Sequence, residues 1–164
     1  MKKNITFSIV VPVYNSEKTL TRLFERIKTT FETRKLTFEV IFVEDCGTDN
    51  SWKVLKALKK AYPNENITIV KLSKNFGQHN ALLCGFQLAE GDFVVTIDDD
   101  LQIPPEEILK LADRQADTDA DMVYGIYEKK KHSFVRNLGS KFVKNLFEYG
   151  LSLIHISEPT RHAS

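Results

Sequence analysis

The chain has 164 residues, of which 42% are hydrophobic and 27% charged, the size and balance of one globular domain. Its 23 lysines and arginines against 22 aspartates and glutamates leave a formal net charge of +1, so we expect no nucleic-acid partner. The two cysteines, Cys46 and Cys84, lie far apart without metal-site spacing, which argues against a disulfide framework and a zinc site.

The N-terminus lacks the pattern of a signal peptide, since residues 1–6 run straight into a short apolar strand pattern. No stretch approaches the roughly 20 apolar residues of a membrane helix. We therefore expect a cytoplasmic protein. Contact with the inner face of a membrane would come only from segments beyond the C-terminus of this chain.

Strand and helix patterns alternate along the chain. Short segments rich in β-branched residues, typical of strands buried on both faces, lie at 7–11, 39–43, 67–71, 93–97 and 122–124. Helical spacing or helix-start signals lie between them, at 20–31 behind the candidate N-cap Ser16, at 54–62, at 80–89, and from Pro104 or Pro105 to about 114. This order predicts an α/β fold with a mostly parallel sheet covered by helices on both faces. A ligand site is then expected at the carboxyl ends of the strands.

The last fourteen residues, 151–164, break this pattern, with neither a clean period nor a helix cap. We expect an irregular tail. It resembles the read-through of vector DNA at the end of a truncated reading frame, and an ordinary frayed terminus is the alternative. The domain itself is expected to occupy residues 1–150.

Three consecutive aspartates follow the fourth predicted strand. Asp98, Asp99 and Asp100 repel one another and need a compensating cation, which a diphosphate-bound Mg²⁺ or Mn²⁺ would supply. Asp98 and Asp100, with Gln102, present oxygen ligands from one turn. A solvated acidic turn is the alternative, but the position at a strand end favours the metal site.

A second acidic run serves as an internal control. Asp117, Asp119 and Asp121 precede a strand, which puts them at the opposite edge of the sheet, where a solvated loop is expected. The chain also has no GxxxxGK[ST] or GxGxxG motif, so a metal ion must neutralise most of the diphosphate charge.

Two further loops follow strands. Glu44 and Asp45 are candidates to accept hydrogen bonds from a ribose or base, or else to cap the next helix, which Thr48 or Asp49 could also do. Residues 75–79 open the third helix, so their backbone N–H groups could face the ligand, whereas the His79 side chain is expected at the surface.

Four motifs occur in order: VPVYN, VEDCGTDNS, NFGQHNALLCGF and GDFVVTIDDDLQIPPEEI. Together they resemble family 2 glycosyltransferases with the GT-A fold, a Rossmann-like nucleotide-diphospho-sugar transferase fold. The DxDxQ run followed by two prolines is similar to the polyprenyl-phosphate branch, which includes dolichol-phosphate mannose synthases. The NxGQH run resembles undecaprenyl-phosphate aminoarabinose transferases. The resemblance covers about residues 5–147 and only the front part of a family catalytic region, so it implies a C-terminally truncated domain.

The resemblance implies metal-dependent transfer of a sugar from a nucleoside diphosphate sugar to a polyprenyl phosphate in the bacterial cell envelope. Ser16 and the resemblance of the NxGQH run favour a UDP-sugar over a guanine nucleotide sugar as the donor. Asp98 and Asp100 are the implied catalytic residues, and with Gln102 they are the implied metal ligands. The implied nucleotide-binding residues are Pro12, Tyr14, Asn15, Glu44, Asp45, Asp98 and Asp99.

Arg136 and Lys131 are the candidates to meet the acceptor phosphate, and for the lysines at 129–131 a solvated basic turn is an equal alternative. Two other functions stay open. One is a family 2 transferase that acts on a saccharide hydroxyl, and the other is a catalytically incompetent fragment that only binds nucleotide sugars. Homo-oligomerisation is also open.

Overall fold

The computed structural model describes residues 6–125 and the strand 152–156. Its six strands form one sheet in the order β3-β2-β1-β4-β6-β5, and every neighbouring pair is parallel. The strands are β1 (Phe7–Val13), β2 (Phe38–Glu44), β3 (Ile67–Lys71), β4 (Phe93–Thr96), β5 (Met122–Gly125) and β6 (Ser152–Ile156). The prediction of a mostly parallel α/β sheet is confirmed.

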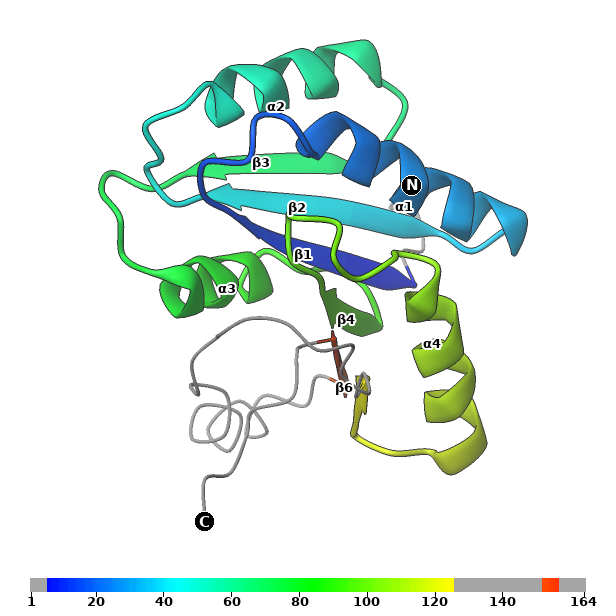
Figure 1. Cartoon of the computed structure of the whole chain (residues 1–164). Coiled ribbons are helices and arrows are strands. Elements are labelled where there is room, and N and C mark those ends of the chain that lie inside the picture. Colours follow the sequence, from blue (N-terminus) through cyan, green and yellow to red (C-terminus); the bar gives the residue numbers. More distant parts are fainter. Residues whose placement is uncertain (1–5, 126–151, 157–164) are drawn as a thin grey trace.

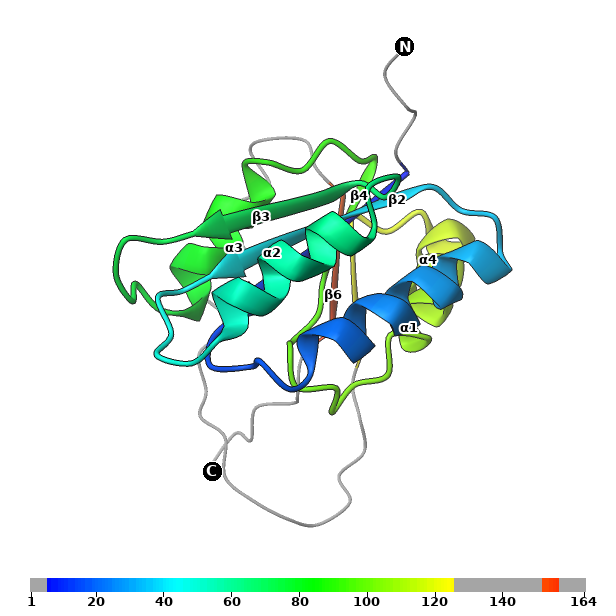
Figure 2. The same ribbon diagram turned by 90° about the horizontal axis from the view of Figure 1, so that it is seen from above.

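Four helices connect the strands: α1 (Leu20–Thr33), α2 (Ser51–Ala61), α3 (Gln78–Phe86) and α4 (Glu107–Thr118). Figure 1 shows α1 and α2 on one face of the sheet and α3 on the other. Figure 2 shows α4 beside α1, where the Arg26–Glu106 and Arg34–Asp113 ion pairs join the two helices. Within the described residues, no helix has the length and apolar character needed to cross a membrane.

Strand β1 shows how the pleat separates two cores. All seven of its residues are buried, as expected for a central strand covered on both faces. Ile9 and Val11 pack in the core with α1 and α2, whereas Val10 lies in the second core with α3. Because side chains alternate across a strand, one apolar run supplies both faces.

The helix starts differ from the sequence expectations. Ser16 does not cap α1, which begins four residues later behind Thr19. Its hydroxyl lies instead within hydrogen-bond distance of the Tyr14 carbonyl and Asp99. Helix α4 begins at Glu107, after the two prolines, and α3 spans Gln78–Phe86 instead of 80–89.

Strand β6 corrects the expectation of an irregular tail. Ser152–Ile156 lies between β4 and β5 and pairs in parallel with both. The connection from β4 through α4 to β5 does not lead to the neighbouring place in the sheet but leaves a gap one strand wide. The backbone groups of β4 and β5 that face this gap need hydrogen-bond partners. Residues 152–156 supply these partners. The remainder of 151–164 lies outside the described residues.

Candidate functional site

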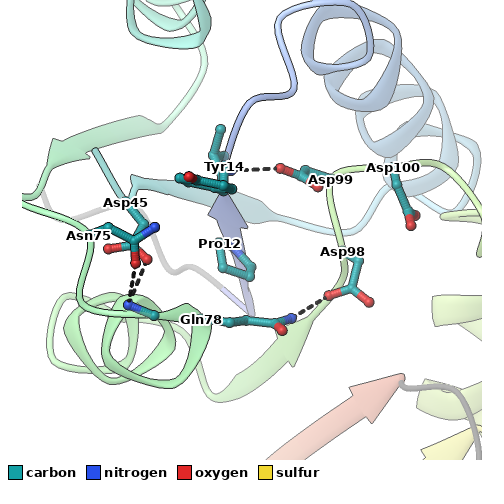
Figure 3. Close-up of a pocket in the computed structure, with 10 residues that line it drawn as sticks. Pro12, Tyr14, Asp45, Asn75, Gln78, Asp98, Asp99 and Asp100 are labelled. Atoms are coloured by element: carbon teal, nitrogen blue, oxygen red, sulfur yellow. Dashed lines mark hydrogen bonds between the residues drawn. The ribbon is translucent and has the colours of Figure 1, made fainter. Parts of the chain in front are cut away.

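A pocket of about 350 Å³ opens at the carboxyl ends of the central strands (Figure 3). Its size falls within the usual range of small-molecule sites. The loops that follow β1, β2, β3 and β4 all contribute to its wall. The lining residues are Pro12, Val13, Tyr14, Asp45, Asn75, Gly77, Gln78, Asp98, Asp99 and Asp100.

The three aspartates after β4 do not behave alike. Asp98 Oδ1 accepts a hydrogen bond from Gln78 Nε2 at 2.8 Å, and Asp100 Oδ1 accepts one from the backbone N–H of Gln102 at 2.9 Å. Asp99 turns toward the loop after β1 and accepts a hydrogen bond from the Tyr14 N–H at 3.0 Å (Figure 3). The outer two carboxylates are therefore left at the pocket, while the middle one joins two loops.

Asp99 has an altered acidity. Burial raises the pKa of its carboxyl above the ordinary value, and the neighbouring charge of Asp100 adds to this effect. Hydrogen bonds from the Ser16 hydroxyl and the Tyr14 N–H oppose the rise only in part. The surroundings of Asp99 thus disfavour the charged form of its carboxyl.

Asp45 links the second and third loops. Its two carboxylate oxygens accept hydrogen bonds from the backbone N–H groups of Phe76 at 2.7 Å and Gly77 at 2.8 Å. The loop that opens α3 is thereby fixed against the end of β2. Asp45 lines the pocket, and each of its carboxylate oxygens keeps a further lone pair.

Asn15 and Glu44 lie behind the pocket and are not among its lining residues. Asn15 Oδ1 accepts hydrogen bonds from the N–H groups of Thr48 at 2.7 Å and Asp49 at 3.3 Å. Glu44 is buried, and its Oε1 accepts the Gly47 N–H at 2.5 Å. Both residues shape the loop after β2, because Asn15 Oδ1 and Glu44 Oε1 bind its backbone, while Glu44 Oε2 lies 3.8 Å from Lys71 Nζ.

The start of α2 is held by Asp49. Its carboxylate accepts hydrogen bonds from the backbone N–H groups of Ser51 and Glu17, each at 2.9 Å. Asn50 is the N-cap residue of α2 and its side chain makes no capping hydrogen bond, so among the candidates from the sequence Asp49, one position earlier, is the residue that binds the first N–H group of the helix. Glu44 and Asp45 are engaged elsewhere.

The donor set suits a hard divalent cation shared with a bound diphosphate. Asp98 and Asp100 offer carboxylate oxygens at the pocket, the ligand type that Mg²⁺ and Mn²⁺ prefer. In the part of the chain that the structure describes, no group of three or more His, Cys, Asp or Glu side chains could hold a metal ion. The remaining ligands would thus have to be phosphate oxygens or water. Gln102 was predicted as a metal ligand but is not a lining residue, and its backbone N–H donates the hydrogen bond to Asp100.

The segment that opens α3 supplies three lining residues that were not named as site residues from the sequence: Asn75, Gly77 and Gln78. Their position directly after β3 could have identified them as site residues from the sequence. Only the backbone of this segment, however, was expected to face a ligand. Asp119 and Asp121 of the acidic control run lie between α4 and β5, at the edge opposite the pocket as predicted, whereas Asp117 lies in the last turn of α4 and not in a loop. Arg136 and Lys131 lie outside the described residues.

Comparison with known proteins gives a family match over most of the chain. The model of glycosyl transferase family 2 matches residues 8–162. A similar solved structure is S. aureus TarS 1-349, with 27% identity and a TM-score of 0.62 over 80% of this chain and 39% of that one. The same protein in complex with UDP-GlcNAc matches with 27% identity and a TM-score of 0.62 over 80% of this chain and 37% of that one.

A more distant structure shares the fold. It is the mannosyltransferase PcManGT from Pyrobaculum calidifontis in complex with GDP-Man and Mn²⁺, at 23% identity and a TM-score of 0.54 over 60% of this chain and 28% of that one. The chain thus spans about two-fifths or less of the length of these similar proteins.

Proposed function

Because the chain belongs to glycosyl transferase family 2, we propose that its pocket binds a nucleoside diphosphate sugar with Mg²⁺ or Mn²⁺ for sugar transfer to a polyprenyl phosphate. Its architecture is the GT-A fold of this family. One observation carries the proposal. Tyr14, Asp45 and the pair Asp98 and Asp100 come from three separate strand-end loops and line a single pocket.

UDP is the proposed nucleotide. The similar structures of S. aureus TarS include complexes with UDP and with UDP-GlcNAc, and the similarity covers 80% of this chain. Pro12, Tyr14 and Asp45 would border the nucleoside, since they lie together on the side of the pocket formed by β1 and β2 (Figure 3). The carboxylates of Asp98 and Asp100 would face the diphosphate.

Asp98 and Asp100 would hold the cation between the protein and the diphosphate. When bound, the cation supplies positive charge that stabilises the departing nucleoside diphosphate. Gln78 orients Asp98 through its side-chain amide, so one of the two carboxylates is positioned before any ligand binds.

A polyprenyl phosphate is the proposed acceptor because the DxDxQ run and the two prolines after it resemble the polyprenyl-phosphate branch of the family. The phosphate of such a lipid is already ionised at neutral pH. Such a nucleophile needs positioning and charge neutralisation more than a general base. Arg136 and Lys131 are the proposed contacts of this phosphate. A saccharide hydroxyl would instead require a carboxylate base to remove its proton.

Calorimetric titration of the chain with UDP and GDP, each in MnCl₂ and in excess EDTA, tests the donor proposal. We expect UDP to bind in the presence of Mn²⁺ and more tightly than GDP. Equal affinity for UDP in EDTA would contradict the metal site. Tighter binding of GDP would contradict the choice of base.

A transfer assay tests the acceptor. Radiolabelled UDP-sugars are incubated with the protein and either undecaprenyl phosphate in detergent or an oligosaccharide. We expect label in the lipid product. Arg136→Ala should lower the amount of this label more strongly than it lowers the affinity for UDP. Label in the oligosaccharide alone would favour the hydroxyl acceptor.

A further inference from the structure

We propose that Asp99 is a positioning residue that locks the Tyr14 side of the pocket to the cation side. It does so through its contacts with Tyr14 and Ser16, without serving as a metal ligand itself. This inference rests on the proposed function, because it assigns Asp99 a task in nucleotide binding. It separates the middle aspartate of the triplet from its two neighbours.

One carboxylate oxygen makes both contacts. Asp99 Oδ2 accepts a hydrogen bond from the Tyr14 backbone N–H at 3.0 Å and another from the Ser16 hydroxyl. These contacts span 85 and 83 residues of sequence, so they join the end of β1 to the end of β4. Hydrogen bonds to an ionised acceptor are among the stronger ones in proteins.

The backbone of the first loop is shaped for this contact. Asn15, between the two donors, has a φ of 54°, in the left-handed region that asparagine tolerates better than most residues. Its side chain fixes that conformation by accepting the N–H groups of Thr48 and Asp49. The turn at Asn15 thus presents the Tyr14 N–H and the Ser16 hydroxyl to the same oxygen.

Tyr14 depends on this lock because the residue is 50% exposed. Little packing therefore holds the ring, and its position at the pocket follows from its backbone. The distance between the ring and the carboxylates of Asp98 and Asp100 is set where the two loops meet, which is at Asp99 (Figure 3). A ligand that spans both sides of the pocket binds best when this spacing is preorganised.

The test measures the affinity of the chain for UDP in MnCl₂ by calorimetry. Asp99→Ala removes the acceptor, and we expect the affinity to fall about tenfold, the effect of losing hydrogen bonds to a charged group. Asp99→Asn keeps an acceptor oxygen in the same place, and should restore the affinity to within about threefold of the wild type. Asp117→Asn, on the exposed surface of α4, is the matched control for a lost charge.

A double-variant cycle adds a readout that a general loss of stability would not produce. If Asp99 acts by positioning Tyr14, then Asp99→Ala should not weaken binding further when Tyr14 is already alanine. Additive losses in the double variant would overturn the proposal. So would an Asp99→Ala variant that binds UDP like the wild type, or an Asp99→Asn variant as weak as Asp99→Ala.

Two outcomes separate this inference from the function on which it rests. A wild-type chain that binds neither UDP nor GDP overturns the proposed function and the inference with it. A wild-type chain that binds UDP while Asp99→Ala has no effect overturns the inference alone. Should Asp99→Ala fail to fold, Ser16→Ala removes one of the two contacts, and a loss of affinity that vanishes in the Tyr14→Ala background is the expected result.

Discussion

Gln78 donates a hydrogen bond from its side-chain amide to Asp98 across 2.8 Å, which joins the first residue of α3 to the loop after β4 (Figure 3). The same end of α3 is held to β2, since Asp45 accepts the N–H groups of Phe76 and Gly77. A continuous set of contacts therefore runs from the end of β2 to a proposed cation ligand.

Replacing Gln78 with alanine should weaken Mn²⁺-dependent binding of UDP by about tenfold, the lower end of the range for partners that orient metal ligands. The physical reason is that Asp98 loses the donor that orients it. Gln87→Ala, at the exposed C-terminal end of the same helix, is the control and should leave the affinity unchanged. Equal effects of the two substitutions in calorimetry would show that Gln78 does not orient Asp98.

Asp100→Asn should lower the Mn²⁺-dependent affinity for UDP by on the order of 100-fold, because a direct ligand matters at least as much as a partner that orients it. The asparagine oxygen can still accept the Gln102 N–H, so the turn itself should persist. Asp119→Asn should have no effect, since Asp119 caps the C-terminal end of α4 at the opposite edge of the sheet. If both variants bind UDP equally, the placement of the cation after β4 is wrong.

Asp49→Ala should lower the free energy of unfolding at pH 7 by about 1 to 2 kcal/mol, the usual effect of losing a helix cap. Burial alone would raise the pKa of Asp49, but hydrogen bonds from Ser51 and from the Glu17 N–H outweigh it and lower the pKa below the ordinary 3.8. Folding thus favours the carboxylate. Its stabilisation is complete well above pH 3.8 and is lost as the pH falls below that value through the folded pKa.

Urea unfolding at a series of pH values measures this effect. The difference between wild type and Asp49→Ala should be constant from about pH 8 to pH 6 and should shrink in acid. Asp117→Ala, at an exposed position of α4, should change stability by less than about 0.5 kcal/mol throughout. A difference that grows on acidification would contradict the assignment.

Gly85→Ala should destabilise the fold by about 1 to 3 kcal/mol, even though alanine favours a helix by about 1 kcal/mol over glycine. A Cβ atom at this position would lie 2.3 Å from Val10 Cγ1, so α3 would have to move away from β1. Val10→Ala removes that methyl group. The double variant should therefore be more stable than the sum of the two single losses predicts, which chemical denaturation measures. Strictly additive losses of stability would show that the contact with Val10 is not what destabilises the Gly85→Ala variant.

Many features of this protein follow from local sequence. The alternation of β-branched runs with helical spacing predicted five strands and their parallel arrangement, because side-chain period and crossover handedness leave few alternatives. The same logic placed Asp98 and Asp100 at the ligand edge and Asp119 at the other, since only the position before or after a strand decides the edge. The family resemblance implied nucleotide binding by Pro12, Tyr14 and Asp45, and these three residues line the pocket.

Other features depend on contacts between distant segments. Ser16 has the character of a helix cap in sequence, yet its hydroxyl lies at Asp99, which is 83 residues away. Asn15 and Glu44 lie at strand ends as pocket residues do, but Asn15 Oδ1 and Glu44 Oε1 bind the backbone of the loop after β2. Residues 152–156 form a strand because the facing edges of β4 and β5 offer backbone N–H and C=O groups that need partners, and this segment pairs with both. Sequence position determines which edge of the sheet a side chain reaches, whereas its hydrogen-bond partner is decided only when the loops of several strands meet.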